Sequence, residues 1–130
     1  MSLLIEKQII MPLLQAVMLG ADHLQLDEVE TIVESLLPFG NQYEEIDIAL
    51  STIRKNQKKE DESILILRNL VARNEQNWCG KALLAAPLFR LGNKQWKILV
   101  NEILLKSQDA DAQYLAKIVL RESRGEFSLN

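Results

Sequence analysis

A stripe of apolar residues occurs three times along the chain. The segment from Asp27 to Leu37 is similar to the segment from Asp61 to Val71, which begins 34 residues later, and a looser third copy lies a further 33 residues on. The stripe positions are spaced i, i+3, i+4, i+7 and i+8, which places them on one face of an α-helix. The five columns are Val29/Ser63/Trp96, Ile32/Ile66/Leu99, Val33/Leu67/Val100, Leu36/Leu70/Ile103 and Leu37/Val71/Leu104.

A helical stripe that recurs about every 34 residues is typical of tetratricopeptide (TPR) repeats. Each such repeat is a pair of antiparallel helices that buries its apolar face against the next repeat. An irregular helical bundle is the alternative, because leucine-rich helices resemble one another by composition alone. We therefore predict an all-α fold, a TPR-like solenoid of helical hairpins with about three helix pairs and a C-terminal capping helix.

Residues that start and stop helices give the expected boundaries. Side chains that accept hydrogen bonds from the first turn of a helix are expected at three N-caps, Asp27, Asn41 and Asp109. Glycine is expected to end three helices, at Gly40, Gly92 and Gly125. Pro87 falls inside an apolar helical pattern, where we expect it to kink or split the helix. The expected helices cover residues 12–23, 27–37, 41–53, 61–73, 78–91, 94–106 and 109–124.

The composition favours one folded domain that does not bind nucleic acid. Of the 130 residues, 48% are hydrophobic, which excludes intrinsic disorder, and 25% are charged, which is ordinary for a water-soluble protein. The net charge of −3 argues against nucleic acid as a partner, because proteins that bind it usually carry a basic face. We expect a single TPR-like domain over residues 1–124 and a flexible tail over residues 125–130.

The chain has no sequence feature of export or membrane insertion. Its first residues lack a basic segment and a small-residue cleavage site, and no apolar run approaches membrane-spanning length. The single cysteine cannot form an internal disulfide, which suits a reducing compartment. We expect a cytoplasmic protein.

Residues for catalysis or metal binding do not occur in a recognisable arrangement. His23 is the only histidine, and Cys79 has neither a nearby histidine nor a second cysteine beside it. The acidic pairs Asp27/Glu28 and Asp61/Glu62 precede expected helices, where the helix dipole favours negative charge. The basic run from Arg54 to Lys59 is followed at once by acidic residues, which indicates a solvated turn. We predict that the protein is not an enzyme and that it needs no metal or cofactor.

One segment resembles a known family. The sequence from Lys81 to Trp96, KALLAAPLFRLGNKQW, followed by Leu99, Ile103 and Leu104, is similar to the third-repeat region of TPR-like proteins of type III secretion. These include the needle-subunit chaperones of the YscG/PscG/AscG kind and related Hrp-type proteins. The stretches 20–30 and 109–112 also resemble the family, so that the similarity covers about residues 12–120. Pro87 and the polar turn at Lys58-Lys59-Glu60 depart from the pattern, and the Trp/Leu-Gly/Tyr set of a first TPR helix is missing.

The resemblance implies a cytoplasmic virulence-associated chaperone for protein transport. Such proteins hold a self-polymerising needle subunit, usually together with a small helical co-chaperone, and their concave groove binds the subunit's C-terminal amphipathic helix. In a TPR array, the first helix of each pair lines the concave side. Repeat geometry therefore places the expected groove at Leu14, Met18, Ile48, Thr52, Trp78, Lys81, Ala85, Leu88 and Phe89.

A function of another class is also compatible with the repeats. A generic TPR scaffold or adaptor recognises a short extended peptide, and its groove usually needs cationic or amide side chains to hold the backbone or a carboxylate. The candidates for this role are Lys55, Asn56 and Lys81.

Overall fold

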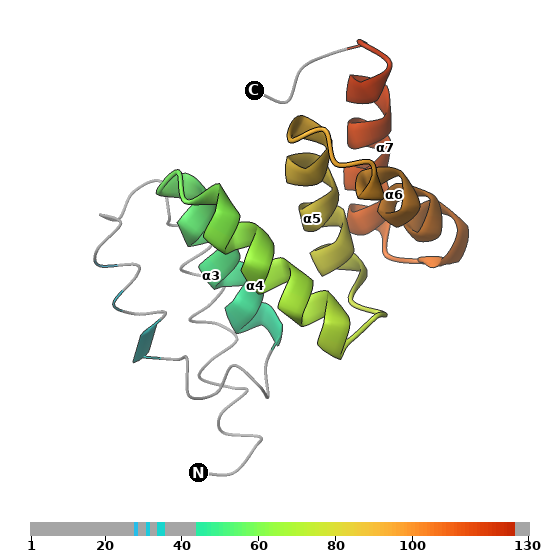
Figure 1. Ribbon diagram of the computed structural model, residues 1–130. Coiled ribbons are helices and arrows are strands. Elements are labelled where there is room, and N and C mark those ends of the chain that lie inside the picture. Colours follow the sequence, from blue (N-terminus) through green and yellow to red (C-terminus); the bar gives the residue numbers. More distant parts are fainter. Residues whose placement is uncertain (1–27, 29–30, 32–33, 36–43, 127–130) are drawn as a thin grey trace. The chain divides into compact units, whose positions relative to one another are not determined.

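The computed structural model describes residues 44–126 together with Glu28, Thr31, Glu34 and Ser35 (Figure 1). This part of the chain is entirely helical and contains no strand. The all-α prediction is therefore confirmed for the described residues, and successive helices joined by short connections are consistent with TPR-like hairpins. The helices are α3 (Glu44–Asn56), α4 (Glu60–Arg73), α5 (Trp78–Arg90), α6 (Gln95–Lys106) and α7 (Ala110–Ser123).

Several sequence predictions lie outside the described residues. They comprise the expected helix over residues 12–23, the caps Asp27 and Asn41, the stop at Gly40, and the side chains of His23, Leu14 and Met18. Within the expected helix 27–37, Glu28, Thr31, Glu34 and Ser35 are helical and exposed, as positions between the apolar columns should be.

The chain divides into two compact units, residues 1–66 and 67–130. The boundary falls inside α4, so the first half of this helix belongs to one unit and the second half to the other. A single domain over residues 1–124 with a tail over 125–130 stays a prediction.

In the first unit, α3 has the charge distribution that stabilises a helix. Its first turn is acidic and its last turn carries Arg54 and Lys55, so both ends complement the helix dipole. The predicted inner face is buried at Ile46, Ala49, Leu50 and Ile53.

A turn at residues 57–59 joins α3 to α4. Lys58 adopts a left-handed backbone conformation with φ of 63°, and the Lys59 amide donates to the Arg54 carbonyl. The acidic first turn of α4 follows directly, as predicted, and its Glu62 forms an ion pair with Arg54 at 3.5 Å. The solvated turn predicted for the run from Arg54 to Lys59 is therefore limited to residues 57–59, because Arg54, Lys55 and Asn56 form the end of α3.

The second unit is built around α5, which contacts both α6 and α7, while α6 and α7 also contact each other. The third copy of the repeated stripe lies on α6, and four of its five positions are buried: Trp96, Leu99, Val100 and Ile103. From the second copy, Leu67 and Leu70 of α4 are also buried. In the two copies that the structure describes, most positions of the apolar columns therefore lie in the core.

Glycine ends α5 and α7 in the same way. Gly92 and Gly125 have φ of 74° and 75°, which suits glycine because it lacks a Cβ atom. In each case the glycine amide donates to the carbonyl three residues earlier, and the next amide donates to the carbonyl five residues before it. This pair of bonds is the Schellman motif, which satisfies carbonyls left free at a helix end.

Asp109 and Asn77 are the N-caps of α7 and α5. The Asp109 carboxylate accepts from the amides of Asp111 and Ala112, as predicted. Asn77, which the sequence placed in a connecting segment, accepts from the Gly80 amide at 2.8 Å.

Pro87 does not split α5. The helix continues through it to Arg90, and the Leu91 amide donates to the Pro87 carbonyl at 3.0 Å. Proline removes only the bond to the Leu83 carbonyl, and the buried ring contributes to the interior of the unit. Of the two predicted effects of Pro87, the split is therefore wrong, and the kink stays a prediction.

Candidate functional site

The structure separates the predicted groove residues into half-buried and fully covered side chains. Ile48 and Thr52 of α3 and Trp78 and Phe89 of α5 are half-buried. Lys81, Ala85 and Leu88 are only 3%, 0% and 1% exposed. Contact between any of these residues and a partner stays a prediction.

The sequence placed Lys81, Ala85 and Leu88 in an open groove, but the structure buries all three side chains. A helix at the edge of an array keeps one face free, but α5 lies between neighbours and contacts both α6 and α7. Side chains on several sides of α5 are therefore covered, and Ala85 and Leu88 are packing residues in this structure.

Lys81 forms a buried polar cluster with residues of α5 and α6. Its Nζ atom donates to Glu102 Oε1 at 2.5 Å and lies 4.9 Å from the centre of the Trp78 ring. Burying an ammonium group is costly unless it is paired and hydrogen-bonded. The carboxylate and the ring face supply that compensation, which explains how a lysine is tolerated in the interior.

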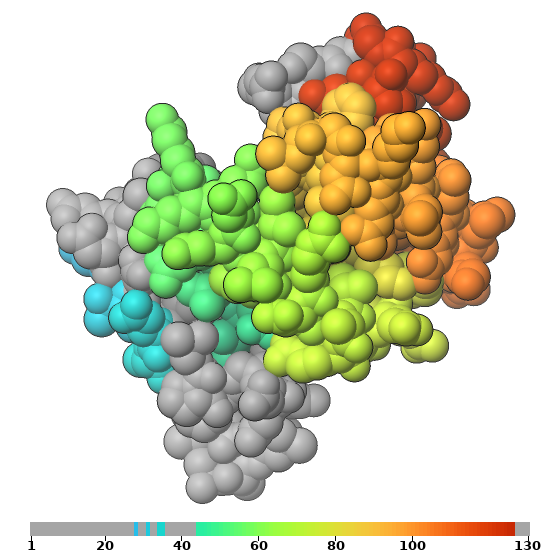
Figure 2. Space-filling view, in the orientation of Figure 1, coloured from blue at the N-terminus to red at the C-terminus, as the bar shows by residue number. Residues whose placement is uncertain are grey.

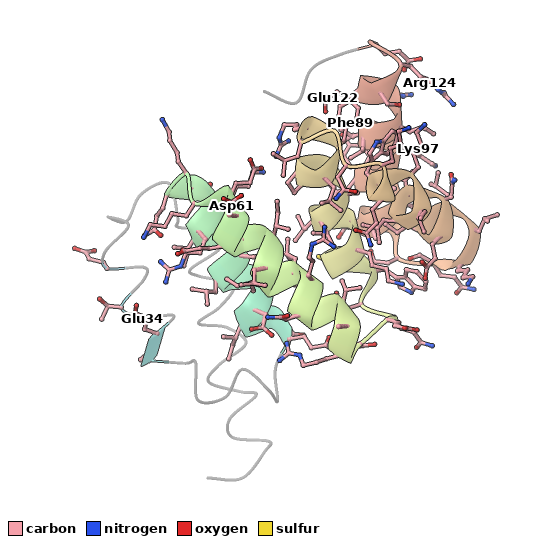
Figure 3. The ribbon with its side chains drawn as sticks, in the orientation of Figure 1. Glu34, Asp61, Phe89, Lys97, Glu122 and Arg124 are labelled. Carbon is pink, nitrogen blue, oxygen red and sulfur yellow. The ribbon has the colours of Figure 1, made fainter. Side chains whose placement is uncertain are left out.

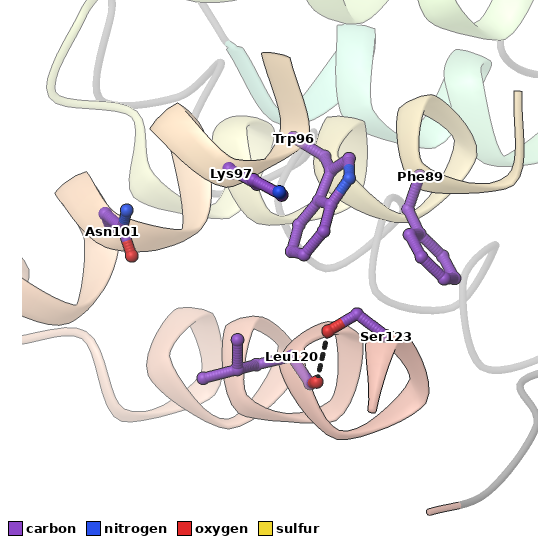
Figure 4. A pocket seen from close by; sticks show the side chains of 6 residues that line it. All are labelled: Phe89, Trp96, Lys97, Asn101, Leu120 and Ser123. Atoms are coloured by element: carbon purple, nitrogen blue, oxygen red, sulfur yellow. Dashed lines mark hydrogen bonds between the residues drawn. The ribbon is translucent and has the colours of Figure 1, made fainter. Parts of the chain in front are cut away.

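An open pocket lies where α5, α6 and α7 meet, and we call it the aromatic pocket (Figure 4). Its volume is about 370 Å³. Its lining residues are Phe89, Trp96, Lys97, Asn101, Leu120 and Ser123. Figure 3 shows Phe89 and Lys97 at the same end of this group of helices as Glu122 and Arg124 of α7.

The two aromatic rings are fixed by the turn that joins α5 to α6. Phe89 belongs to the last turn of α5, directly before the Gly92 motif, and Trp96 belongs to the first turn of α6. The Asn93 side chain accepts from the Gln95 amide at 2.9 Å and so caps that turn. The rings meet edge to face, with centroids 5.2 Å apart, an arrangement that the charge distribution of aromatic rings favours.

The rim of the aromatic pocket is polar. Lys97 places its Nζ atom 5.9 Å from the centre of the Trp96 ring. Asn101 and Ser123 are exposed, and the Ser123 hydroxyl donates to the Leu120 carbonyl (Figure 4). A hollow with aromatic and leucine walls under a polar rim is suited to an apolar side chain carried by another polypeptide.

A second hollow, the α4–α6 pocket, lies between the second half of α4, α5 and α6 and also measures about 370 Å³. Four of its polar side chains are paired with one another. Arg68 donates to Gln95 at 2.8 Å, and Lys81 is held by Glu102. We therefore place the candidate site in the aromatic pocket.

Helix α6, orange in Figure 2, has single apolar side chains that are exposed. Ile98 is 65% exposed and Leu105 is 82% exposed. Isolated apolar residues of this kind are common on folded proteins and do not define a site by themselves.

Cys79 does not have the environment of a reactive thiol. Burial raises its pKa above the ordinary value, and the negative charges of Asp109 and Asp111 raise it further. A raised pKa leaves less thiolate at neutral pH, so nucleophilic attack is disfavoured. This environment suits a structural thiol.

No group of metal-binding side chains occurs in the part of the chain that the structure describes. In the same residues, every helix is too short or too polar to cross a bilayer.

Sequence reasoning identified only part of the aromatic pocket. Phe89 was expected near a partner surface and Trp96 in the core, and both line the pocket. Lys97, Asn101, Leu120 and Ser123 were missed. Periodicity shows which face of a helix is apolar, but it does not show which residues of separate helices meet at an opening.

Comparison with known protein families identifies the family of this chain. The family described as "Bacterial type III secretion protein (HrpB1_HrpK)" matches residues 1–125. The chain belongs to this family. No curated protein and no solved structure matches the chain. The resemblance to Hrp-type secretion proteins is thereby confirmed, and a HrpB1_HrpK protein has its role in type III secretion.

Proposed function

We propose that this HrpB1_HrpK protein is a non-enzymatic cytoplasmic chaperone that holds a self-polymerising helical needle subunit before its secretion. The observation that carries the proposal is the family match over residues 1–125, which assigns the chain to type III secretion. A small helical co-chaperone completes the proposed complex, and virulence is the process it serves.

The physical basis is the coverage of an apolar helix face. A subunit that polymerises through an amphipathic helix exposes an apolar stripe, which in water associates with other copies unless another apolar surface covers it. The aromatic pocket offers such a surface at Phe89, Trp96 and Leu120. Its volume of about 370 Å³ is near the lower end for ligand pockets. It therefore suits an anchoring side chain of the helix, while Trp78 of the same unit is proposed as a further contact.

A scaffold that clamps an extended peptide is less well supported. Lys81 was one of three candidates for such a clamp, beside Lys55 and Asn56, but its ammonium group is buried and bonded to Glu102. A buried, paired ammonium group is not free to bind the carboxylate of a peptide.

The test fills the aromatic pocket without disturbing the core. Ser123 is an exposed residue in the last turn of α7, so Ser123→Trp places a large ring at the pocket with little effect on folding. We expect the variant to lose at least about tenfold in affinity for the needle subunit of its own secretion system. Binding is measured by co-expression and size-exclusion chromatography, and subunit polymerisation by light scattering.

Lys117→Trp is the matched control. Lys117 is exposed on the same helix and does not line the pocket, so this variant should bind the subunit like the wild type. Equal binding by the wild type and both variants would remove the aromatic pocket from the proposal. Failure of the wild-type chain, with its co-chaperone, to prevent polymerisation would overturn the chaperone function itself.

A further inference from the structure

Among the described residues that line the aromatic pocket, Lys97 alone is charged. Its side chain is exposed, and its ammonium group lies 5.9 Å from the centre of the Trp96 ring (Figure 4). The other described lining residues are apolar or neutral, and none of them has a carboxylate. The opening therefore combines apolar walls with a positive charge at its rim.

Carboxylates near this rim in the sequence are engaged elsewhere. Glu102, on the same helix as Lys97, accepts from Lys81. Glu126, after the end of α7, forms an ion pair with Arg121 at 3.8 Å. Within the described part of the chain, Lys97 itself forms no ion pair. Its ammonium group is therefore available to a negative charge that another molecule brings.

A second cation lies at the same end of the helices. Figure 3 shows Lys97, Glu122 and Arg124 there, and Arg124 directly follows Ser123, which lines the pocket. Glu122 is half-buried, whereas Lys97 and Arg124 are exposed. The charge that this end presents to solvent is therefore mainly positive, although the whole chain has a net charge of −3. Such a local field favours an acidic partner.

The contact between Lys97 and Trp96 does not prevent a new ion pair. A cation above an exposed ring is held weakly, and the flexible stem of lysine allows the ammonium group to turn. An apolar side chain that enters the pocket covers the ring, and a carboxylate beside it then forms a charge-assisted hydrogen bond with the displaced ammonium group.

The spacing of these groups fits one turn of a partner helix. Side chains four residues apart on a helix have Cβ atoms about 5–6 Å apart. The ammonium group of Lys97 lies 5.9 Å from the centre of the ring on which an anchoring side chain would pack. A helix that inserts an apolar side chain at Trp96 therefore brings the side chain one turn away within reach of Lys97.

The size of the pocket selects little among apolar anchors. A cavity of about 150 Å³ holds a benzene ring, and the aromatic pocket measures about 370 Å³. Leucine, methionine and phenylalanine all fit this volume. Selectivity between partner helices therefore comes from the charge on the rim.

We propose that the aromatic pocket binds an amphipathic helix in which an aspartate or glutamate lies one turn from the apolar anchor and pairs with Lys97. Phe89, Trp96 and Leu120 hold the anchor, and Lys97 determines which helices bind, because a lysine or arginine at the same position is repelled. The identification of this helix with the needle subunit rests on the proposed function, whereas the charge preference of the pocket does not.

The first experiment measures the charge preference with model helices and needs no needle subunit. The probes are alanine-rich helical peptides of about 18 residues with acetylated and amidated ends. Each has a leucine, a phenylalanine four residues later, and glutamate, glutamine or lysine after four more. They are titrated into the full-length chain while NMR records the indole signal of Trp96, with Trp78 as the reference outside the pocket.

The glutamate peptide should bind about threefold more tightly than the glutamine peptide and about tenfold more tightly than the lysine peptide. Lys97→Glu should invert this order, which damage to the fold would not do. Lys106→Glu is the matched control, because it changes the net charge equally, is exposed on the same helix and does not line the pocket. This variant should keep the wild-type order. Ser123→Trp, which fills the pocket, should remove binding of all three peptides.

The second experiment uses the needle subunit of the same secretion system. Lys97→Glu should weaken its binding at least about fivefold, and Lys106→Glu should leave it unchanged. Each acidic residue on the subunit's amphipathic helix is then replaced by lysine in turn. One of these replacements should restore binding to the Lys97→Glu chain.

Equal affinities of the three peptides for the wild-type chain, an order that Lys97→Glu leaves unchanged, or no binding at the pocket would each overturn the proposal. A dimer of the wild-type chain that shifts the Trp96 signal without peptide would also overturn it, because the pocket would then belong to a second copy. The expected peptide order without any binding of the needle subunit would support the charge preference and contradict the proposed function alone. Subunit binding that Lys97→Glu does not change, without a peptide order, would contradict the charge preference alone.

Discussion

At the scale of single residues, Lys81 shows the limit of reading a helix face from sequence. The sequence placed Lys81 in an exposed groove, but it could not show that the packing of α5 against α6 buries this side chain. The partner, Glu102, lies 21 residues later on α6, and no short-range pattern joins the two positions. Prediction of the pair requires the packing of α5 against α6, which only the structure provides.

Removing the carboxylate from this pair should destabilise the protein more than removing the lysine. Glu102→Ala leaves a buried ammonium group without its partner, and we expect a loss of about 2 kcal/mol in the free energy of unfolding, reduced from the value for a fully buried pair because Glu102 is partly exposed. Lys81→Met keeps the volume and removes the charge, so we expect a loss below about 1 kcal/mol.

Urea denaturation of the full chain, followed by circular dichroism, measures both changes. The double variant Lys81→Met with Glu102→Ala should be more stable than Glu102→Ala alone. Equal losses for the two single variants would show that side-chain packing, and not the unpaired charge, determines the cost.

At the scale of helices, most boundaries were predictable because their causes are local. Asp109 caps α7 and Gly92 and Gly125 end α5 and α7 as the sequence indicated. Asn77 was missed although asparagine directly before an apolar run is a preferred N-cap. The helix is not split at Pro87, contrary to one of the predicted effects. Burial of the proline ring and the remaining backbone hydrogen bonds of α5 outweigh the one hydrogen bond that proline removes.

A substitution at Gly92 measures the cost of a left-handed backbone conformation without any contribution from side-chain packing. A Cβ atom at this position would meet no other atom within 4 Å, so any cost of Gly92→Ala comes from the left-handed backbone conformation. We expect a loss of about 1 kcal/mol in the free energy of unfolding, measured by urea denaturation. Gly92→Asn should cost less, since asparagine tolerates this conformation better; an alanine variant as stable as the wild type would contradict the argument.

At the scale of the whole molecule, the repeat period predicted the all-α fold of the described residues and most of the core positions in the second and third copies of the stripe, but not the division into units or the aromatic pocket. The division at residues 66 and 67 falls within a continuous helix, where the sequence contains no linker signal. The pocket combines α5, α6 and α7, so its existence depends on how three helices pack rather than on the pattern of any one of them.

Because α4 belongs to both units, we expect a substitution that destabilises the first unit to destabilise the second unit as well. Leu65 is 59% exposed, in the half of α4 that belongs to the first unit. Leu65→Pro interrupts the helix at a cost of about 3 kcal/mol, whereas Leu65→Ser should change stability only slightly.

Tryptophan fluorescence reports the second unit, because Trp78 and Trp96 both lie there, while far-ultraviolet circular dichroism reports the whole chain. We expect the Leu65→Pro substitution to shift both unfolding transitions together. A fluorescence transition that stays at the wild-type urea concentration would show that the second unit unfolds independently of α4.

The mutual contacts of α5, α6 and α7 join parts of the chain that lie within residues 78–123. Folds whose contacts are this local reach their native state in roughly microseconds to milliseconds. Under the proposed function, such speed has a use during protein synthesis: the newly made chaperone is ready before its client has accumulated to the concentration at which filaments nucleate.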